Sequence, residues 1–206
     1  PINSQYSNSP YENPNNEKFN YNPQKALELL KEAGYTKRNS DGWLVQEGSG
    51  KVLRFEINIY KSIEDRVTTL QQMLKEYGID MQIKFMDFNS IIKNVNERNF
   101  KITSFRYTGL TFPNPETSMQ SSLADKNNNN NIWGFKSDRV DELLKEYDVA
   151  FDMEERIKII QEIDGIWAET HPTAYGLGEN NRKTMWWNKF GYPEWVHTRY
   201  GGEFWD

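Results

Sequence analysis

The sequence of 206 residues contains no cysteine, only two histidines and no long apolar run. The absence of cysteine excludes disulfide bonds, thiolate nucleophiles and zinc or iron–sulfur centres held by cysteine. No apolar stretch approaches the roughly 18 consecutive residues that indicate a membrane-spanning helix. Basic residues are not in excess either, because the formal net charge is −5 and Lys and Arg form no run. A surface for binding nucleic acid is therefore not expected.

Motifs for catalysis and ion binding are also missing. His171 and His197 do not show the HExxH spacing of a zinc peptidase, and no GxSxG sequence marks a serine nucleophile. The Gly-Ser-Gly-Lys stretch at 48–51 lacks the outer residues of a phosphate loop and is interpreted as a hairpin turn. The Asn-rich stretch that starts at Asp125 lacks the glycine and glutamate of a calcium loop and is interpreted as a solvated loop. We therefore predict no catalytic residues, no metal site and no cofactor.

Aromatic residues are abundant, at 14% of the chain with seven Trp, and they provide apolar area for a core. The length suits one large domain or two small ones. The first residues are polar and rich in Pro and Asn. We expect residues 1–20 to form an extended lead-in, or to be the cut end of a longer chain.

Hydrophobic periodicity predicts an α/β fold in the first half. A helix is expected from Pro23, which suits a first helical position, with Asn22 as its cap and Gly34 as its end. Turn signals in the forties predict a hairpin, and alternating apolar residues predict a strand at 53–59.

A βαβ unit is expected next. The segment 62–78 has the apolar spacing of a helix, with Ser62 as its cap and Gly78 as its end, and residues 79–85 alternate as a strand. Strands joined through a helix by short links should be parallel. A helix near 88–98 and a strand at 100–107 would extend the same sheet.

Two further helices are expected to form a hairpin. The first carries an apolar stripe of four residues, and the second begins at Asp152, which forms a capping box with Glu155. Asp164 interrupts the apolar stripe of the second helix. The first stripe consists of Val140, Leu143, Leu144 and Tyr147.

The strand at 100–107 leads into a loop stiffened by proline, and this loop is the candidate ligand site. Ligands of α/β proteins bind beyond the carboxyl ends of strands, which favours Tyr107 and the residues after it. Arg106 suits a ligand carboxylate or phosphate, although a salt bridge to a surface acid is an equal alternative. Asn114 and Glu116 could bind ligand amides or sugar hydroxyls.

Other aromatic residues allow two interpretations. They could line a groove for an apolar or sugar ligand, or they could close the core beneath long loops. The residues concerned are Trp133, Trp186, Trp187, Trp195 and Trp205.

Several segments occur in a characteristic order: "YNPQKALELLKEAGY", "LQQMLKEYGIDMQIK", "RNFKI" and "SDRVDELLKEYDVAFDMEERIKIIQEIDGIW". Together they resemble the C-terminal part of the oligopeptide-type (family 5) extracytoplasmic solute-binding proteins of ABC importers. The stretches "NNIWGFKSDRVDELL" and "WWNKFGYPEW" with the ending "FWD" are similar to the subfamily that serves long peptides and microcin C.

The resemblance implies one lobe of a two-lobed periplasmic-binding-protein (type II) fold, with a mixed sheet, a βαβ unit and a helical hairpin. Residues 21–206 would be the C-terminal lobe and would hold half of a site that closes on the ligand. The implied partners are the N-terminal lobe of the same protein and the transmembrane subunits of an ABC permease. The implied location is the periplasm or cell surface, with a lipid anchor left open.

The resemblance also bears on the candidate site. In the family, the strand that corresponds to 100–107 ends at the cleft, with an aromatic residue where Tyr107 stands. In the dipeptide and oligopeptide importers an Asp three residues later pairs with the peptide ammonium, whereas this chain has Leu110. This difference fits the long-peptide branch and removes the reason to expect recognition of a free N-terminus. The full candidate set is Arg106, Tyr107, Leu110, Thr111, Asn114, Glu116 and Trp133.

A long or modified peptide is therefore the expected ligand, and muropeptides and oligosaccharides stay open. The first alternative is a carbohydrate-binding module or glycosidase fragment, which the seven Trp and the Asn-rich loop would suit. The second alternative is a structural domain in which all aromatic residues belong to the core.

Overall fold

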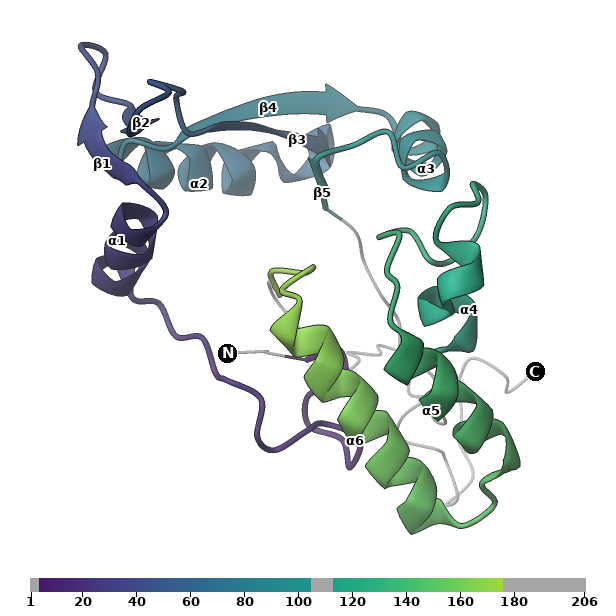
Figure 1. The fold of residues 1–206 in the computed structure, drawn as a ribbon. Coiled ribbons are helices and arrows are strands. Elements are labelled where there is room, and N and C mark those ends of the chain that lie inside the picture. The colour runs from purple at the N-terminus through teal and green to yellow at the C-terminus, as the bar shows by residue number, and fades with distance from the viewer. Residues whose placement is uncertain (1–3, 105–112, 176–206) are drawn as a thin grey trace, which may run out of the picture.

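The computed structural model describes residues 4–104 and 113–175, and its main sheet has three parallel strands in the order β4-β3-β5 (Figure 1). β3 spans Arg54–Tyr60, β4 spans Asp80–Met86 and β5 spans Ile102–Thr103. β3 lies in the middle of the sheet. It pairs with β4 along its whole length, and on its other side it pairs with β5 at Ile57 and Asn58. The predicted parallel arrangement is confirmed.

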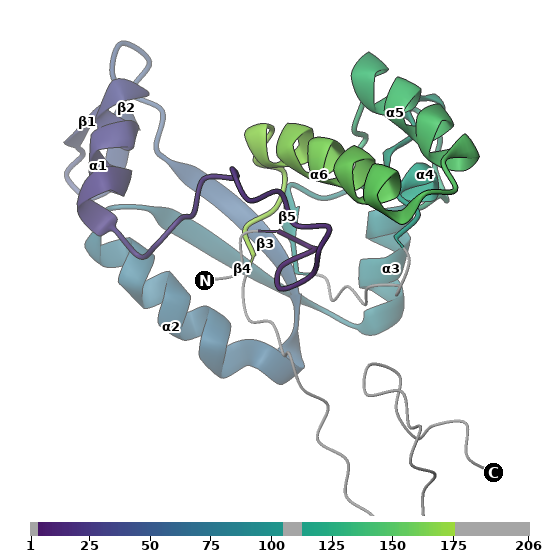
Figure 2. The same ribbon diagram turned by 90° about the horizontal axis from the view of Figure 1, so that it is seen from below.

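Helix α2 (Glu64–Glu76) connects β3 to β4 and packs against one face of the sheet (Figures 1 and 2). The contact buries Ile59 on β3, Val67 on α2 and Met81 on β4. The predicted cap at Ser62 is wrong. Ser62 lies within a short 3-10 turn, Lys61–Ile63, so that α2 begins after Ile63 without a side-chain cap.

A small antiparallel hairpin precedes this unit. Helix α1 spans Pro23–Glu32, and the Asn22 side chain accepts a hydrogen bond from the Lys25 amide at 3.0 Å, as the sequence predicted. β1 (Tyr35–Arg38) and β2 (Leu44–Gln46) follow as the hairpin strands. The Leu44 amide donates to the Gly78 carbonyl at 2.7 Å, which attaches the hairpin to the turn between α2 and β4.

Helix α3 (Phe88–Asn96) follows β4 directly, and the Asp87 carboxylate caps it by accepting from the Ser90 amide at 3.1 Å. The buried face of α3 carries Ile91 and Val95. This helix confirms the prediction for 88–98 to within two residues at its C-terminal end, since a left-handed residue, Arg98, comes soon after it.

The second half is helical. The short helix α4 (Glu116–Met119) and a 3-10 turn at Ser121–Leu123 precede α5 (Asp138–Val149) and α6 (Met153–Glu169), which pack side by side (Figure 1). All four residues of the predicted stripe on α5 are buried, and Asp152 caps α6 as expected. Among the described residues, no helix is long and apolar enough to cross a membrane.

Residues 4–16 were expected as part of an extended lead-in, but they form successive turns that bind α6. The Ser4 hydroxyl donates to one oxygen of the Asp164 carboxylate at 2.6 Å. The main-chain amide of Asn13 donates to the other oxygen of the same carboxylate at 3.0 Å. Tyr11 is buried in the helical core. Asp164 therefore interrupts the apolar stripe because it binds this segment, a contact across the chain that periodicity does not reveal.

Candidate ligand-binding site

The carboxyl ends of β3, β4 and β5 meet at one edge of the sheet, because the three strands are parallel (Figure 1). The last residue of β3, Tyr60, stacks on Phe88, the first residue of α3, with ring centroids 6.0 Å apart and planes 18° apart. Phe88 is 62% exposed. We call this pair the Tyr60–Phe88 platform. It offers an exposed aromatic surface where α/β proteins commonly bind ligands.

Charged groups flank the platform. Asp87 precedes Phe88 in the chain, and its carboxylate accepts hydrogen bonds from the Ser90 hydroxyl at 2.6 Å and the Ser90 amide at 3.1 Å. These hydrogen bonds lower the pKa of Asp87, so it stays ionised at neutral pH. Lys61 follows Tyr60 and is exposed. The edge thus combines an aromatic surface with one negative and one positive group.

A buried acceptor lies close to the same edge. Asn58 is two residues before Tyr60, and its side-chain oxygen is buried without a hydrogen-bond partner among the described residues. Its main-chain carbonyl accepts from the Thr103 hydroxyl at 3.1 Å, which holds the end of β5 against β3. Sequence reasoning missed Asn58 and the platform. The sequence did hold one signal, since Phe88 directly follows the helix cap Asp87 at the carboxyl end of β4, the edge at which α/β proteins bind ligands.

Four of the predicted site residues, Arg106, Tyr107, Leu110 and Thr111, lie outside the described residues. Their assignment stays a prediction. So does the interpretation of the four Trp residues in the tail, which lie outside the same ranges.

Asn114 and Glu116 lie together at the start of α4. The Glu116 amide donates to the Asn114 side-chain oxygen at 3.1 Å, and Asn114 is exposed. The preceding Pro113 is fixed because its carbonyl accepts a hydrogen bond from the Tyr147 hydroxyl of α5. Glu116 also lines a pocket of about 160 Å³ against α5, together with Gln120, Ser122, Asp141, Leu144, Lys145 and Asp148.

Trp133 lies elsewhere. Its ring meets Trp167 of α6 edge to face, with centroids 4.9 Å apart, and packs against the helical core. It is half-buried and does not line the pocket that contains Glu116. The structure thus brings Asn114 and Glu116 together and places Trp133 against the core, which favours the core interpretation for this residue.

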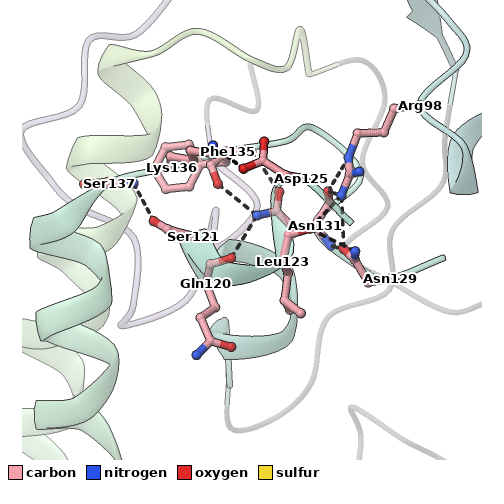
Figure 3. A network of polar contacts seen from close by, with 10 residues as sticks. All are labelled: Arg98, Gln120, Ser121, Leu123, Asp125, Asn129, Asn131, Phe135, Lys136 and Ser137. Atoms are coloured by element: carbon pink, nitrogen blue, oxygen red, sulfur yellow. Dashed lines mark hydrogen bonds and ion pairs between the residues drawn. The ribbon is translucent and has the colours of Figure 1, made fainter. Parts of the chain in front are cut away.

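The Asn-rich loop was expected to be solvated throughout, and this expectation is wrong for Asn131 (Figure 3). The Asn131 side chain is fully buried and makes three hydrogen bonds to the main chain. Its amide nitrogen donates to the carbonyls of Gln120 at 3.1 Å and Phe135 at 2.9 Å, and its oxygen accepts from the Phe135 amide at 2.9 Å. Asn131 therefore stabilises the loop through the hydrogen bonds of its buried side chain.

Arg98 attaches this loop to the end of α3 (Figure 3). Its guanidinium donates to the Asn131 carbonyl at 2.8 and 3.0 Å and to the Leu123 carbonyl at 3.0 Å. Because α3 begins at the platform, this network connects the sheet edge to the helical half. Among residues 4–104 and 113–175, no group of three or more acidic or histidine side chains could hold a metal ion.

Comparison with solved structures identifies the class of protein. The oligopeptide-binding protein AppA from Bacillus subtilis, in complex with a nonapeptide, has a TM-score of 0.65 and 27% identity over 76% of this chain and 31% of that chain. Lactococcal OppA, complexed with an endogenous peptide, has a TM-score of 0.66 at 18% identity over 84% of this chain and 33% of that chain. The fold is that of one part of an oligopeptide-type solute-binding protein.

The family follows from the sequence. Residues 1–130 match the bacterial extracellular solute-binding proteins, family 5 middle region, and the chain belongs to this family. AppA of Bacillus subtilis (strain 168) is 28% identical over 85% of this chain and 32% of its own length. The probable peptide-binding protein YejA of Agrobacterium fabrum is 26% identical over 84% of this chain and 28% of its own length. The chain thus spans about a third of the length of these relatives.

Proposed function

We propose that this chain is part of an extracytoplasmic protein that binds peptides and delivers them to an ABC permease. The observation that carries the proposal is the family match over residues 1–130, together with the similarity to AppA, whose solved complex contains a nonapeptide. The family description names solute binding, and no bond is made or broken in the proposed mechanism. The carbohydrate-module and glycosidase alternative has no support from the family or from AppA.

The ligand would lie over the carboxyl edge of the sheet. The Tyr60–Phe88 platform would pack against an apolar or aromatic side chain of the peptide, and Asp87 and Lys61 would meet its polar groups. The predicted residues Arg106, Tyr107, Leu110 and Thr111 follow β5, whose end lies at the same edge, and Asn114 and Glu116 continue that loop. Main-chain contacts would supply affinity with weak side-chain selectivity.

Within the family, we place the chain in the branch that serves long peptides and microcin C. Leu110 supports this placement, because the resemblance puts it where the dipeptide and oligopeptide importers carry an Asp. Without a carboxylate at that position, a buried peptide ammonium would lose its partner, at a cost of several kcal/mol. A ligand whose N-terminus is blocked, modified or left outside the site avoids that cost.

The proposed mechanism is closure of two lobes around the ligand. Residues 21–206, together with the segment 4–16 that binds α6, would form one lobe, and the rest of the complete protein would supply the other. The permease subunits would then recognise the closed form outside the cytoplasm.

Tryptophan fluorescence tests the proposal. The complete protein and this chain are titrated with peptides of graded length, with muropeptides and with oligosaccharides. We expect saturable changes with the longer peptides in the complete protein and weak changes in this chain alone. Equal affinity in both would contradict a site shared between lobes, and binding of oligosaccharides alone would contradict the peptide assignment.

A further inference from the structure

The turn between α5 and α6 carries exposed apolar side chains. Phe151 is 91% exposed and Val149 is 72% exposed, and Met153, the first residue of α6, is 45% exposed. Phe151 is more exposed than any other large apolar residue in the described part of the chain. The turn lies at the end of the helical hairpin, away from the three-stranded sheet (Figure 1). We call these three residues the α5–α6 tip.

The conformation of the turn does not require Val149 or Phe151, whereas the sulfur of Met153 accepts a hydrogen bond from the Tyr11 hydroxyl at 3.6 Å. The hairpin is closed by Ala150, which is buried, and by Asp152, whose carboxylate accepts from the Glu155 amide at 3.0 Å. Arg156 donates to the Ala150 carbonyl at 3.3 Å. Polar residues at 149 and 151 would leave all these contacts intact. Contiguous apolar side chains that are exposed to solvent commonly mark an interaction surface.

The charges around the tip select the kind of partner. Four acidic residues surround it, all of them exposed: Asp148, Asp152, Glu154 and Glu155. The nearest basic residue, Arg156, is turned inward, with its guanidinium 4.0 Å from the centroid of the Tyr147 ring, and the exposed Lys145 and Lys158 lie about one helical turn further from the tip along α5 and α6. The tip is therefore an apolar knob with a negative surround.

This charge pattern argues against two other occupants. Anionic lipid headgroups would be repelled by the four carboxylates, so the tip does not suit a bacterial membrane surface. Two copies of the tip would repel each other for the same reason. A protein surface with positive potential would be attracted, and its encounter with the tip would be accelerated.

We infer that the α5–α6 tip is a docking surface for a protein partner that presents an apolar hollow edged by basic side chains. Phe151 would enter the hollow and the carboxylates would meet the basic edge. A contact built on one turn is small, which suits a complex that forms and dissociates repeatedly. The inference does not depend on which ligand the sheet edge binds.

The test uses a probe of the stated chemistry, a fluorescein-labelled amphipathic Leu/Lys helix fused to a folded carrier. Its binding to the full chain is measured by anisotropy for the wild type, Phe151→Ser, Leu29→Ser and Phe88→Ser. Leu29 is the matched control because it is also an exposed apolar residue, at 51%, and lies on α1 outside the proposed ligand site, whereas Phe88→Ser reports binding of the probe at the sheet edge. We expect Phe151→Ser to weaken binding about tenfold or more, because burial of one Phe is lost, and Leu29→Ser to leave it unchanged.

A charge variant and two further probes complete the test. Asp148→Asn with Glu154→Gln should weaken binding of the Leu/Lys probe, added salt should do the same, and a Leu/Glu probe should not bind. Equal binding by the wild type and Phe151→Ser would overturn the inference, as would a loss with Phe88→Ser alone, which would place the probe at the ligand site. Binding to vesicles of phosphatidylcholine and phosphatidylglycerol, or dimerisation in sedimentation, would also overturn it if abolished by Phe151→Ser.

Discussion

Asn131 and Asp164 show how single polar residues hold the irregular parts of this chain. Each is almost fully buried, with 0% and 1% of its surface exposed. Asn131 binds three main-chain groups of one loop, and Asp164 binds the N-terminal segment through Ser4, Asn13 and Asn16. Buried polar groups are stable only when paired, so each residue depends on the segment that it holds.

Asn131→Ala should destabilise the protein by about 3 kcal/mol, because it leaves buried main-chain groups of Gln120 and Phe135 without partners. The matched control is Asn127→Ala, an exposed member of the same Asn run, which should change the free energy of unfolding by less than about 0.5 kcal/mol. Urea unfolding measures both. Similar decreases in the free energy of unfolding for the two variants would contradict the prediction that the buried hydrogen bonds of Asn131 stabilise the protein.

Burial raises the pKa of Asp164, although hydrogen bonds from Ser4 and Asn13 act in the opposite direction. A folded-state pKa above the unfolded value of about 3.9 means that the stabilising contribution is complete below that pH and is lost as the pH rises through the folded pKa. The wild type should therefore lose stability relative to Asp164→Asn as the pH rises from about 4 towards neutrality. Urea unfolding at several pH values measures this difference. A difference that does not change with pH would contradict the prediction.

Helices are the elements whose limits follow most directly from local chemistry. Asn22, Asp87 and Asp152 each cap the helix that follows by accepting a main-chain hydrogen bond. Ser137 does the same for α5 at 3.3 Å. The packing of α6 requires a glycine at position 165, where the N-terminal segment approaches the helix closely. A Cβ atom at this position would lie 2.6 Å from the side-chain nitrogen of Asn13.

Gly165→Ala tests this close approach. Ala is favoured over Gly in a helix by about 1 kcal/mol, so an uncovered position would be stabilised. Here we expect the opposite, with net destabilisation and faster hydrogen exchange in residues 4–16, because Asn13 must move and its hydrogen bond to the Gln161 carbonyl at 2.9 Å is lost. The double variant with Asn13→Ala should recover most of the loss. A more stable Gly165→Ala protein would show that the segment does not pack there.

At the scale of the whole molecule, the parallel strands place Tyr60, Phe88 and the end of β5 at one edge. The Arg98 network then connects the end of α3 to the loop that precedes α5 (Figure 3). A ligand at the edge would therefore contact an element that is coupled to the helical half, as a lobe that moves as one body requires.

Phe88→Ala in the complete protein should weaken peptide binding about tenfold, since the exposed half of the platform is removed. Leu29→Ala is the control, because Leu29 of α1 is also an exposed apolar residue, at 51%, and lies outside the proposed site. Isothermal titration with a long peptide measures both. Unchanged affinity for Phe88→Ala, with a loss for Tyr107→Ala, would move the site towards the loop after β5.

The sequence by itself determined the α/β class, the βαβ unit with parallel strands, the caps at Asn22 and Asp152 and the buried stripe on α5. These features depend on the spacing of apolar residues and on hydrogen bonds between residues three or four apart, so they are visible in a short window. The resemblance carried by several segments in order also pointed to the family that the comparison then showed. The roles predicted for Arg106, Tyr107, Leu110 and Thr111 stay predictions.

Only the tertiary structure decided that residues 4–16 bind α6, that Asn131 is buried within a polar run and that Tyr60 stacks on Phe88. Each of these contacts joins groups that are distant in the chain or polar, and neither kind leaves an apolar period in the sequence. The cost of burying a polar group is met by partners that only the folded chain supplies. The Tyr60–Phe88 platform likewise depends on the folded chain, because its two rings meet only when the parallel strands β3 and β4 end side by side.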